Sequence, residues 1–474
     1  MHRSDQHRAP AGLTARPLAL LDDDHRVDRS IDSAEAASRG WLGHARSAVA
    51  AVFGPAASRP FDVRYWDGTV DRGRRGQRPF TLVIARPESL RRMLLPPSEL
   101  SIAEAYLDGD VDVEGELESA VTVGDVAAAR LRSPRSAALA LLHVLRLPRA
   151  GRAPARNASA EPVVQRAGRE HRRARDRAAV RYHYDVGNEF YRLWLDARMV
   201  YSCAYFRTPD TTLDDAQLAK LDLVCRKLRL RPGDRFLDVG CGWGALVMHA
   251  ARQYGVSALG ITLSNAQAAL ARERIAAAGL SDRCRVEILD YRDLDGERFD
   301  KVASVGMIEH VGLRNLPLYF TAVWKALAPG GLFLNHGIVS VDRSRPLTWR
   351  QRMERRLWKR DAFIERYVFP DGDLPPFQAV IGAAEGAGFE TRDVESLREH
   401  YVLTLHQWVA RLLASGDRAR ALVGERRFRT WQLYMTGSAH AFASGAINVL
   451  QTLLSKPEGG RANLPLTRDD LTRV

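Results

Sequence analysis

The chain has 474 residues, of which 46% are hydrophobic and 27% charged, and its formal net charge is +13. This length allows two or three domains at roughly 100 to 200 residues each, and the composition excludes the disordered and fibrous classes of protein. Four cysteines lie far apart, without a CxxC pair or a histidine at metal-ligand spacing, which predicts a reducing compartment and no metal site. They are Cys203, Cys225, Cys241 and Cys284.

Membrane-spanning and secreted classes are also disfavoured. No stretch reaches the roughly 20 apolar residues that cross a bilayer. The N-terminus MHRSDQHRAP lacks the apolar region of a signal peptide. We therefore expect a cytoplasmic or peripheral protein.

The first part of the chain predicts a tail, a small domain and a linker. Residues 1–45 are polar without sustained periodicity, which predicts a mobile tail. Over 46–123, the strands FDVRYWDG and RPFTLVIA and the helical segments PESLRRMLL and SIAEAYL predict a small α/β domain. Residues 124–179 predict a basic linker, because 130–177 hold thirteen arginines against three acids. Such a run also fits nucleic acid or an anionic membrane surface.

Over 180–458 the pattern alternates between strands and helices, ahead of a C-terminal tail at 459–474. Strands are predicted at 234–240, 256–264, 284–290, 299–307 and 330–340, and helices at 245–255, 265–279 and 319–327. Strands separated by helices indicate a mostly parallel, doubly wound sheet, whose ligands bind at the carboxyl ends of strands.

The first of these strands ends in LDVGCGWGAL, which supplies Asp238, Gly240, Gly242 and Gly244. Glycines at such a turn let the backbone approach a ligand closely. The DxGxGxG spacing differs from the GxGxxG dinucleotide fingerprint, and the second strand ends in Thr262 rather than an acidic residue. A nicotinamide cofactor is therefore disfavoured.

This loop, followed by GITLSNAQ, resembles the class I methyltransferases that use S-adenosylmethionine. More narrowly, RYHYDVGNEFYRLWL, YSCAYF, LDVGCGWG, GITLSNAQ, EHVG, NHGI, FIERYVFPDG and HYVLTLHQW resemble, in order, the cyclopropane fatty acid synthases and their mycolic acid relatives. The resemblance implies an α/β fold: a Rossmann-like doubly wound sheet with a C-terminal helical lipid-binding insertion and a small N-terminal α/β domain. Family members with that extra domain suggest a homodimer.

The resemblance also implies two sets of site residues. For S-adenosylmethionine it implies Tyr201, Ser202, Asp238, Gly240, Gly242, Gly244, Thr262, Gln267, Asp290 and Tyr291. For a bound bicarbonate that removes a proton it implies Glu309, His336 and Tyr401 through side chains and Cys203 and Ile338 largely through backbone. Taken singly, Cys203 would normally be a small buried apolar residue and His336 a core histidine. We expect structural roles for His310, Cys225 and Cys284, and packing near the cofactor for Cys241.

Aromatic residues gather before the sheet, where their faces could stabilise a carbocation, although each alone fits an ordinary core position. They are Tyr184, Phe190, Tyr191, Trp194, Tyr201, Tyr205 and Phe206.

Residues 349–367 carry seven Arg or Lys against three acids, which predicts either a basic amphipathic helix on anionic lipid or a plain surface helix.

The expected function is cyclopropane formation on unsaturated phospholipid acyl chains at the inner face of the membrane, with S-adenosylmethionine and bicarbonate as cofactors. The alternative has the same first step but yields a 10-methylene or 10-methyl branch, as in tuberculostearic acid. A small-molecule N-methyltransferase and a nucleic-acid-binding protein are weaker alternatives, the latter resting on the basic linker alone.

Overall fold

The computed structural model describes residues 24–149, 173–184, 186–294, 296–341, 362–370, 372–462 and 464–472. Two separate sheets organise these residues, one of four strands near the N-terminus and one of seven strands that follows. None of the helices in the described ranges is long and apolar enough to cross a membrane.

The N-terminal domain is built on the four-stranded sheet, in the order β2-β1-β3-β4. Side chains of β3 alternate between buried and half-buried, as expected for a strand with one face against a core. The strands are β1 (Asp62–Arg64), β2 (Val70–Asp71), β3 (Phe80–Ile84) and β4 (Val111–Gly115). The helices are α1 (Asp24–Phe53), η1 (Ala56–Ser58), α2 (Ser89–Leu94), α3 (Glu99–Leu107), α4 (Leu117–Leu131) and α5 (Pro134–Val144).

The structure extends this domain beyond both expected boundaries. Helix α1 begins within the expected tail, and its Ala45 is fully buried in the domain core. Helix α5 lies within the expected linker, yet Ala140, Val144 and Leu147 join the same core. Their spacing of four and three residues marks a helix face that the surrounding arginines obscured. Residues 1–23 and 150–172 lie outside the described ranges.

The second sheet has the order β10-β11-β9-β8-β5-β6-β7, with β5 to β9 parallel and β10 and β11 antiparallel to their neighbours. The predicted doubly wound sheet is therefore confirmed. Its strands are β5 (Arg235–Val239), β6 (Ser257–Thr262), β7 (Cys284–Ile288), β8 (Phe299–Val305), β9 (Leu327–Ser340), β10 (Glu390–Ser396) and β11 (Ile447–Ser455). Cys284, which begins β7, and Cys225 are buried within one apolar core.

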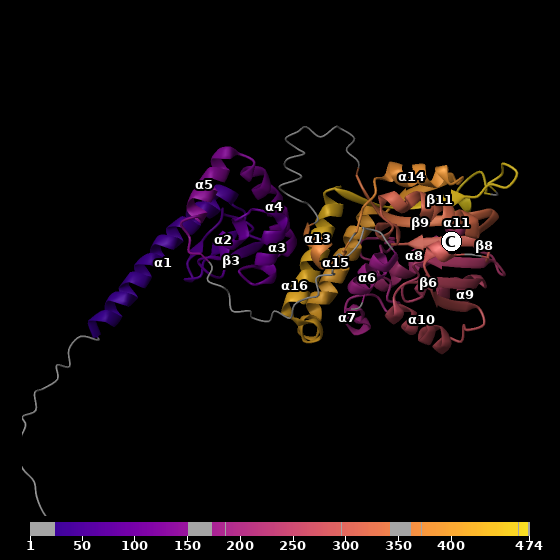
Figure 1. Cartoon of the computed structure of the whole chain (residues 1–474), viewed down its shortest axis with the longest axis horizontal. Coiled ribbons are helices and arrows are strands. Elements are labelled where there is room, and N and C mark those ends of the chain that lie inside the picture. Colours follow the sequence, from indigo (N-terminus) through magenta and orange to yellow (C-terminus); the bar gives the residue numbers. More distant parts are fainter. Residues whose placement is uncertain are drawn as a thin grey trace, which may run out of the picture.

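Helices cover both faces of this sheet (Figure 1). They are α6 (Arg173–Tyr184), α7 (Asn188–Arg192), α8 (Leu213–Leu228), α9 (Ala245–Tyr254), α10 (Asn265–Ala277), η2 (Tyr291–Asp293), η3 (Ile308–His310), η4 (Leu313–Asn315), α11 (Leu316–Ala326), α14 (Phe377–Gly386) and α17 (Asp469–Thr472). The order of the strands reverses at β5, which pairs with β6 on one side and β8 on the other. Ligands of such sheets bind at this reversal.

A helical insertion separates β10 from β11. It consists of α15 (Arg398–Ala414) and α16 (Gly416–Ala443), which is kinked at Gly424. Figure 1 shows α16 between the N-terminal domain and the second sheet. Arg429 of α16 donates to Asp112 of β4 at 2.9 Å, and Tyr106 of α3 donates to Gln432 at 3.1 Å. The insertion thus contacts both domains.

The predicted basic helix at 349–367 is only partly described. Residues 342–361 lie outside the described ranges, and α13 (Ala362–Tyr367) forms the last helical turns of that segment. Phe363 of α13 is buried against Ala103 and Leu107 of α3. The described end of this segment therefore packs against the N-terminal domain.

Candidate functional site

The glycine loop predicted from LDVGCGWG lies at the carboxyl end of β5. Gly240 has a φ of 86°, which favours glycine, and a Cβ there would approach the Met307 side chain to 3.1 Å. The amides of Gly240 and Cys241 donate to the carbonyl of Ile261 on β6, at 2.9 and 3.0 Å. The loop is therefore held against β6, just before the start of α9.

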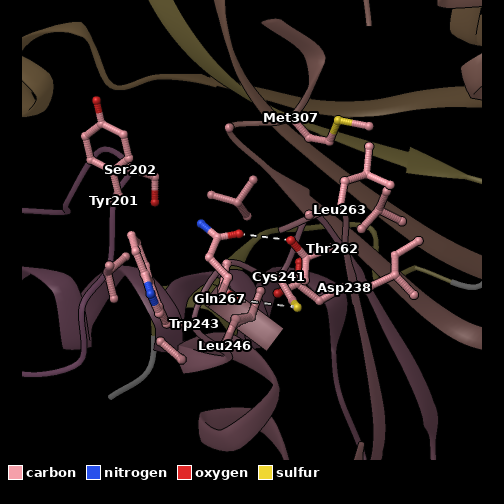
Figure 2. A pocket seen from close by; sticks show the side chains of 18 of the residues that line it. Tyr201, Ser202, Asp238, Cys241, Trp243, Leu246, Thr262, Leu263, Gln267 and Met307 are labelled. Carbon is pink, nitrogen blue, oxygen red and sulfur yellow. Dashed lines mark hydrogen bonds between the residues drawn. The ribbon is translucent and has the colours of Figure 1, made fainter. Parts of the chain in front are cut away.

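A pocket opens above this loop, where β5, β6 and β8 end (Figure 2). The cofactor residues expected from the sequence that line it are Tyr201, Ser202, Asp238, Gly240, Gly242, Thr262, Gln267 and Tyr291. Gly244 lies just outside, as the N-cap of α9. Cys241 lines the pocket, as expected. His310 lines it as well, although we expected a purely structural role for that residue.

Thr262 and Gln267 lie side by side in the wall of the pocket. The Thr262 hydroxyl donates to the Gln267 side-chain oxygen at 2.9 Å, as the dashed line in Figure 2 shows. The Ser264 hydroxyl caps α10 by accepting from the backbone amide of Gln267 at 3.3 Å, which fixes where that helix begins. This pairing leaves the Gln267 side-chain NH2 group as a donor toward the pocket.

Asp290 does not line the pocket. Its carboxylate accepts from Arg292 Nε at 2.8 Å and from a terminal guanidinium nitrogen at 2.6 Å. Burial would raise the pKa of Asp290, but these bonds outweigh it and hold the pKa below its usual value. Arg292 itself lines the pocket. Asp290 therefore reaches the pocket indirectly, by holding Arg292 in place.

Asp238 is a buried carboxylate at the end of β5. Its Oδ1 atom has no hydrogen-bond partner among the described residues. Burial raises the pKa of Asp238 to about 7, against the opposing charge of Lys220. An unpaired carboxyl in such a place is suited to receive a cation.

Lys220 of α8 is a site residue that the sequence analysis missed. It is only 1% exposed, it lines the pocket, and its Nζ donates to the Ser202 hydroxyl at 2.6 Å. Burial lowers the pKa of Lys220 to about 8, although the nearby Cys203 and Asp238 favour the charged form. Lys220 lies among leucines on an ordinary amphipathic helix, so nothing in the sequence indicated a role in the site. Only the fold brings this lysine to the pocket.

Glu309 lies in η3, directly after β8. Its Oε1 accepts from the Ile338 amide of β9 at 2.7 Å, while Oε2 has no hydrogen-bond partner in the described part of the chain. Burial raises the pKa of Glu309 to about 7. Of the residues predicted to bind an ion, Glu309 and Ile338 are thus directly joined.

His336 lies on β9, paired with Val305 of β8 and with Gln451 of β11. The Gln451 side-chain nitrogen donates to His336 Nδ1 at 3.1 Å, and the Gln451 oxygen accepts from Lys227 at 2.8 Å. Nδ1 is therefore an acceptor and Nε2 carries the proton. Within the described ranges Nε2 has no partner. Burial, aided by Lys220 and Lys227, holds the pKa of His336 well below its usual value, so the ring is neutral.

Cys203, Tyr401 and Ile338 pack in one apolar cluster. Burial raises the pKa of the Cys203 thiol, and Sγ donates to the Ala204 carbonyl at 3.3 Å. Cys203 is therefore an inert thiol, and any contribution to a site comes from its backbone. The Tyr401 ring lies 4.5 Å from that of Phe442.

Tyr434 of α16 lies close to both parts of the site, because Tyr201 and Glu309 both affect its ionisation. Burial, with the nearby Glu309 charge, raises the pKa of Tyr434 to about 12. Nothing in a long arginine-rich helix distinguishes Tyr434 from a core tyrosine, so no pattern in the sequence predicted its place beside the site.

Aromatic rings gather around Tyr201. The ring centroids of Trp194 and Trp408 lie 5.4 and 5.2 Å from the ring centroid of Tyr201. The cluster also contains Phe190, Tyr191 and Trp431. Tyr205 and Phe206 belong to the same cluster, as expected, and their rings also stack on His400. The side chain of Tyr184 lies outside the described part. The cluster also contains Trp243, Trp408 and Trp431, which were not among the aromatic residues expected from the sequence.

Together these features define a class of protein. A seven-stranded doubly wound sheet, with an acidic residue and a glycine loop ending the strand at its switch point, is the architecture of a class I S-adenosylmethionine-dependent methyltransferase. The chain belongs to the mycolic acid cyclopropane synthetase family, whose model matches residues 171–452. Residues 48–128 match a separate domain of unknown function.

Three relatives illustrate the range of the family. A probable fatty acid methyltransferase of Pseudomonas putida is 42% identical over 417 residues, covering 87% of this chain and 96% of its own length. Tuberculostearic acid methyltransferase UfaA1 of Mycobacterium tuberculosis is 34% identical over 427 residues, covering 88% and 93%. Mycolic acid cyclopropane synthase CmaA1, solved with SAH and CTAB, is 37% identical with a TM-score of 0.54, covering 59% of this chain and 97% of its own.

Proposed function

We propose that the protein transfers the methyl carbon of S-adenosylmethionine to the cis double bond of unsaturated phospholipid acyl chains, at the inner face of the membrane. The observation that carries this proposal is the pair of unpartnered polar atoms beyond the pocket: among the described residues, neither Glu309 Oε2 nor His336 Nε2 has a hydrogen-bond partner. An acceptor and a donor, both buried and on neighbouring strand ends, suit a small polar ion rather than an apolar chain.

The pocket fits the cofactor. S-adenosylmethionine supplies an electrophilic methyl group and carries a positively charged amine. Asp238 offers that amine an unpaired carboxylate oxygen, and Gly240 lets the backbone approach closely. Gln267 presents its amide donors on the side of Thr262. We infer that the remaining lining residues, including Tyr201, Ser202 and Tyr291, contact the cofactor from the other walls.

The second part of the site fits bicarbonate, which would supply a weak base for the proton that ring closure releases. Glu309 Oε2, when ionised, accepts from the hydroxyl group of such an ion, because the pKa of about 7 keeps the ionised form populated near neutral pH. His336 Nε2–H donates to the same ion, with its tautomer fixed by Gln451. We infer that Tyr401 and the backbones of Cys203 and Ile338 complete the set.

The aromatic cluster would protect the reacting carbons. Attack of an alkene on a methyl group leaves positive charge on the acyl chain, and water would capture it. Rings of Tyr201, Trp408 and Trp431 offer their negative faces to such a charge and exclude water from its neighbourhood.

A branched product is the second candidate. Two relatives that align over both domains of this chain are named a probable fatty acid methyltransferase and a tuberculostearic acid methyltransferase, whereas the cyclopropane synthase CmaA1 aligns over 59% of it. The same first step would then end in a hydride shift and loss of a proton from the added methyl group, giving a 10-methylene chain; a saturated 10-methyl chain would need a further two-electron reduction by a separate reductant.

Product analysis separates the two candidates. The purified protein is incubated with methyl-labelled S-adenosylmethionine and vesicles of oleoyl phospholipid, and the released acyl chains are examined by mass spectrometry with localisation of double bonds. A ring across the original double bond supports cyclopropanation, and a methylene or methyl branch supports the alternative. Acyl chains without added carbon would contradict both.

Glu309→Gln tests the ion site. We expect binding of S-adenosylhomocysteine within a few-fold of the parent protein, because Glu309 is not among the residues lining the cofactor pocket. Turnover should fall at least a hundredfold, a typical loss for a group that assists proton transfer. Turnover close to that of the parent protein would rule out this role.

A further inference from the structure

Helix α5 is apolar on two opposite faces. Ala140 and Val144 on one face are buried in the N-terminal domain core. On the other face Leu139, Leu142 and Leu145 are 51%, 45% and 51% exposed, and they are spaced three residues apart, so they share one side of the helix. Leu141, beside them, is 46% exposed. We call these four residues the leucine face. A helix of a globular domain normally carries polar residues there.

Arginines surround the leucine face. Arg132 and Arg135 at the start of α5, and Arg146 and Arg149 after its end, are all exposed. Residues 126–149 contain no aspartate or glutamate, so acidic side chains of this segment do not neutralise them. An apolar stripe with a cationic margin is the pattern of helices that lie in the interface of anionic membranes.

We propose that the leucine face is a membrane-docking surface, which inserts into the head-group region of an anionic phospholipid bilayer. The helix has 11 residues, roughly half the length that spans a bilayer, so it would lie in the plane of the interface. The proposal deepens the proposed function and rests on it in one respect, that the substrate is a membrane lipid.

A second copy of the chain is a poorer occupant of the leucine face. In a twofold dimer through this face, the arginines of one copy would meet the arginines of the other, because such an interface is self-complementary. Like charges brought together in this way oppose association. Anionic lipid head groups instead supply the opposite charge at the margin and an apolar phase beneath it.

Vesicle sedimentation tests the proposal without requiring turnover. The full chain, without S-adenosylmethionine, is mixed with vesicles of phosphatidylcholine containing phosphatidylglycerol. The triple variant Leu139→Gln, Leu142→Gln, Leu145→Gln should bind at least tenfold more weakly than the parent. A matched control replaces leucines of similar exposure in the catalytic domain, Leu318→Gln, Leu413→Gln and Leu422→Gln, at 50%, 48% and 48% exposed. The control should bind like the parent.

The arginines give a second readout. Arg135→Gln with Arg146→Gln should weaken binding to phosphatidylglycerol vesicles and reduce its sensitivity to salt, because the lost attraction is electrostatic. Thermal unfolding of every variant should match that of the parent. All the replaced side chains are exposed, and none of them belongs to a domain core or to the site. Binding of the triple variant equal to that of the control would overturn the proposal.

Two further outcomes are decisive. A parent chain that sediments as a dimer, and a triple variant that is monomeric but still binds vesicles, would assign the leucine face to a second copy and overturn the proposal. A parent chain that binds vesicles through the leucine face but adds no carbon to their lipids would support the docking surface while rejecting the proposed function.

Discussion

Lys220 and Lys227 lie two turns apart on α8 and serve two different parts of the site. Both are buried, and their spacing of seven residues places them on the same side of the helix. Lys220 donates to Ser202 at the cofactor pocket, whereas Lys227 orients Gln451, which in turn fixes the tautomer of His336. Single substitutions should therefore separate cofactor binding from turnover.

The carboxyl of Asp238 should make cofactor affinity depend on pH. Its pKa of about 7 in the free protein means that the carboxyl is largely protonated below pH 7. A positively charged amine favours the ionised form, so affinity for S-adenosylhomocysteine should rise as the pH increases through 7 and then level off. Calorimetric titration across this range checks the profile, and Asp238→Asn should bind weakly at every pH.

Lys220→Met should shift that profile. Removing the nearby ammonium raises the pKa of Asp238 further, so the rise in affinity should move to higher pH. A profile unchanged in position would show that Lys220 does not act on Asp238.

Gln451→Leu should lower turnover without weakening cofactor binding. The substitution removes the donor to His336 Nδ1, so the imidazole can place its proton on either nitrogen and no longer presents Nε2–H reliably. We expect a fall in kcat of roughly tenfold to a hundredfold, as for other residues that orient a ligating or catalytic histidine. Affinity for S-adenosylhomocysteine serves as the control, and a parallel loss of affinity would indicate general disruption of the sheet.

At the scale of elements, the glycine loop depends on a glycine in the neighbouring strand. A Cβ at Gly260 of β6 would lie 2.7 Å from both Cβ and Sγ of Cys241. Gly260→Ala should therefore displace the loop and lower the free energy of unfolding by about 1–3 kcal/mol, the usual cost of overpacking. Cofactor affinity should fall with it. Chemical denaturation and calorimetry measure the two effects.

Gly382→Ala is the matched control for that prediction. Gly382 lies inside α14, and nothing approaches within 4 Å of the position its Cβ would occupy. Alanine should stabilise the helix by about 0.5–1 kcal/mol and leave cofactor affinity unchanged. An equal loss of stability in both variants would mean that contact with Cys241 is not the cause.

At the scale of the whole molecule, α16 links the N-terminal domain to the reaction site. Its Trp431 and Met435 belong to the aromatic core, while Arg429 on its other side pairs with Asp112 and donates to the carbonyl of Tyr106. Further contacts across the boundary join His406 with Glu118 and His440 with Asp125. The acids belong to the N-terminal domain, whereas Arg429 and the two histidines belong to the helical insertion.

A charge exchange tests this link. Arg429→Asp should reduce turnover several-fold by loosening α16, while cofactor affinity changes little because α16 does not line that pocket. Asp112→Arg should act in the same direction. The double variant should recover part of the lost turnover, since opposite charges again face each other. Absence of any recovery would show that this ion pair does not couple the domains.

The sequence by itself determined the five parallel strands of the second sheet and their carboxyl ends, whereas β10 and β11 were not predicted. Alternating strands and helices are local patterns, so Asp238, Glu309 and His336 could be placed at strand ends, and the glycine loop could be recognised from its spacing. The core face of α5 was also present as a local pattern, but its arginines suggested a linker.

Only the tertiary structure decided which residues meet. Lys220, Gln451 and Tyr434 come from elements far apart in the chain, and each resembles an ordinary core or surface residue in its own segment. Sheet pairing brings Gln451 opposite His336, and helix packing turns Lys220 into the pocket. Contacts of this kind depend on register and packing, which no local pattern of residues contains.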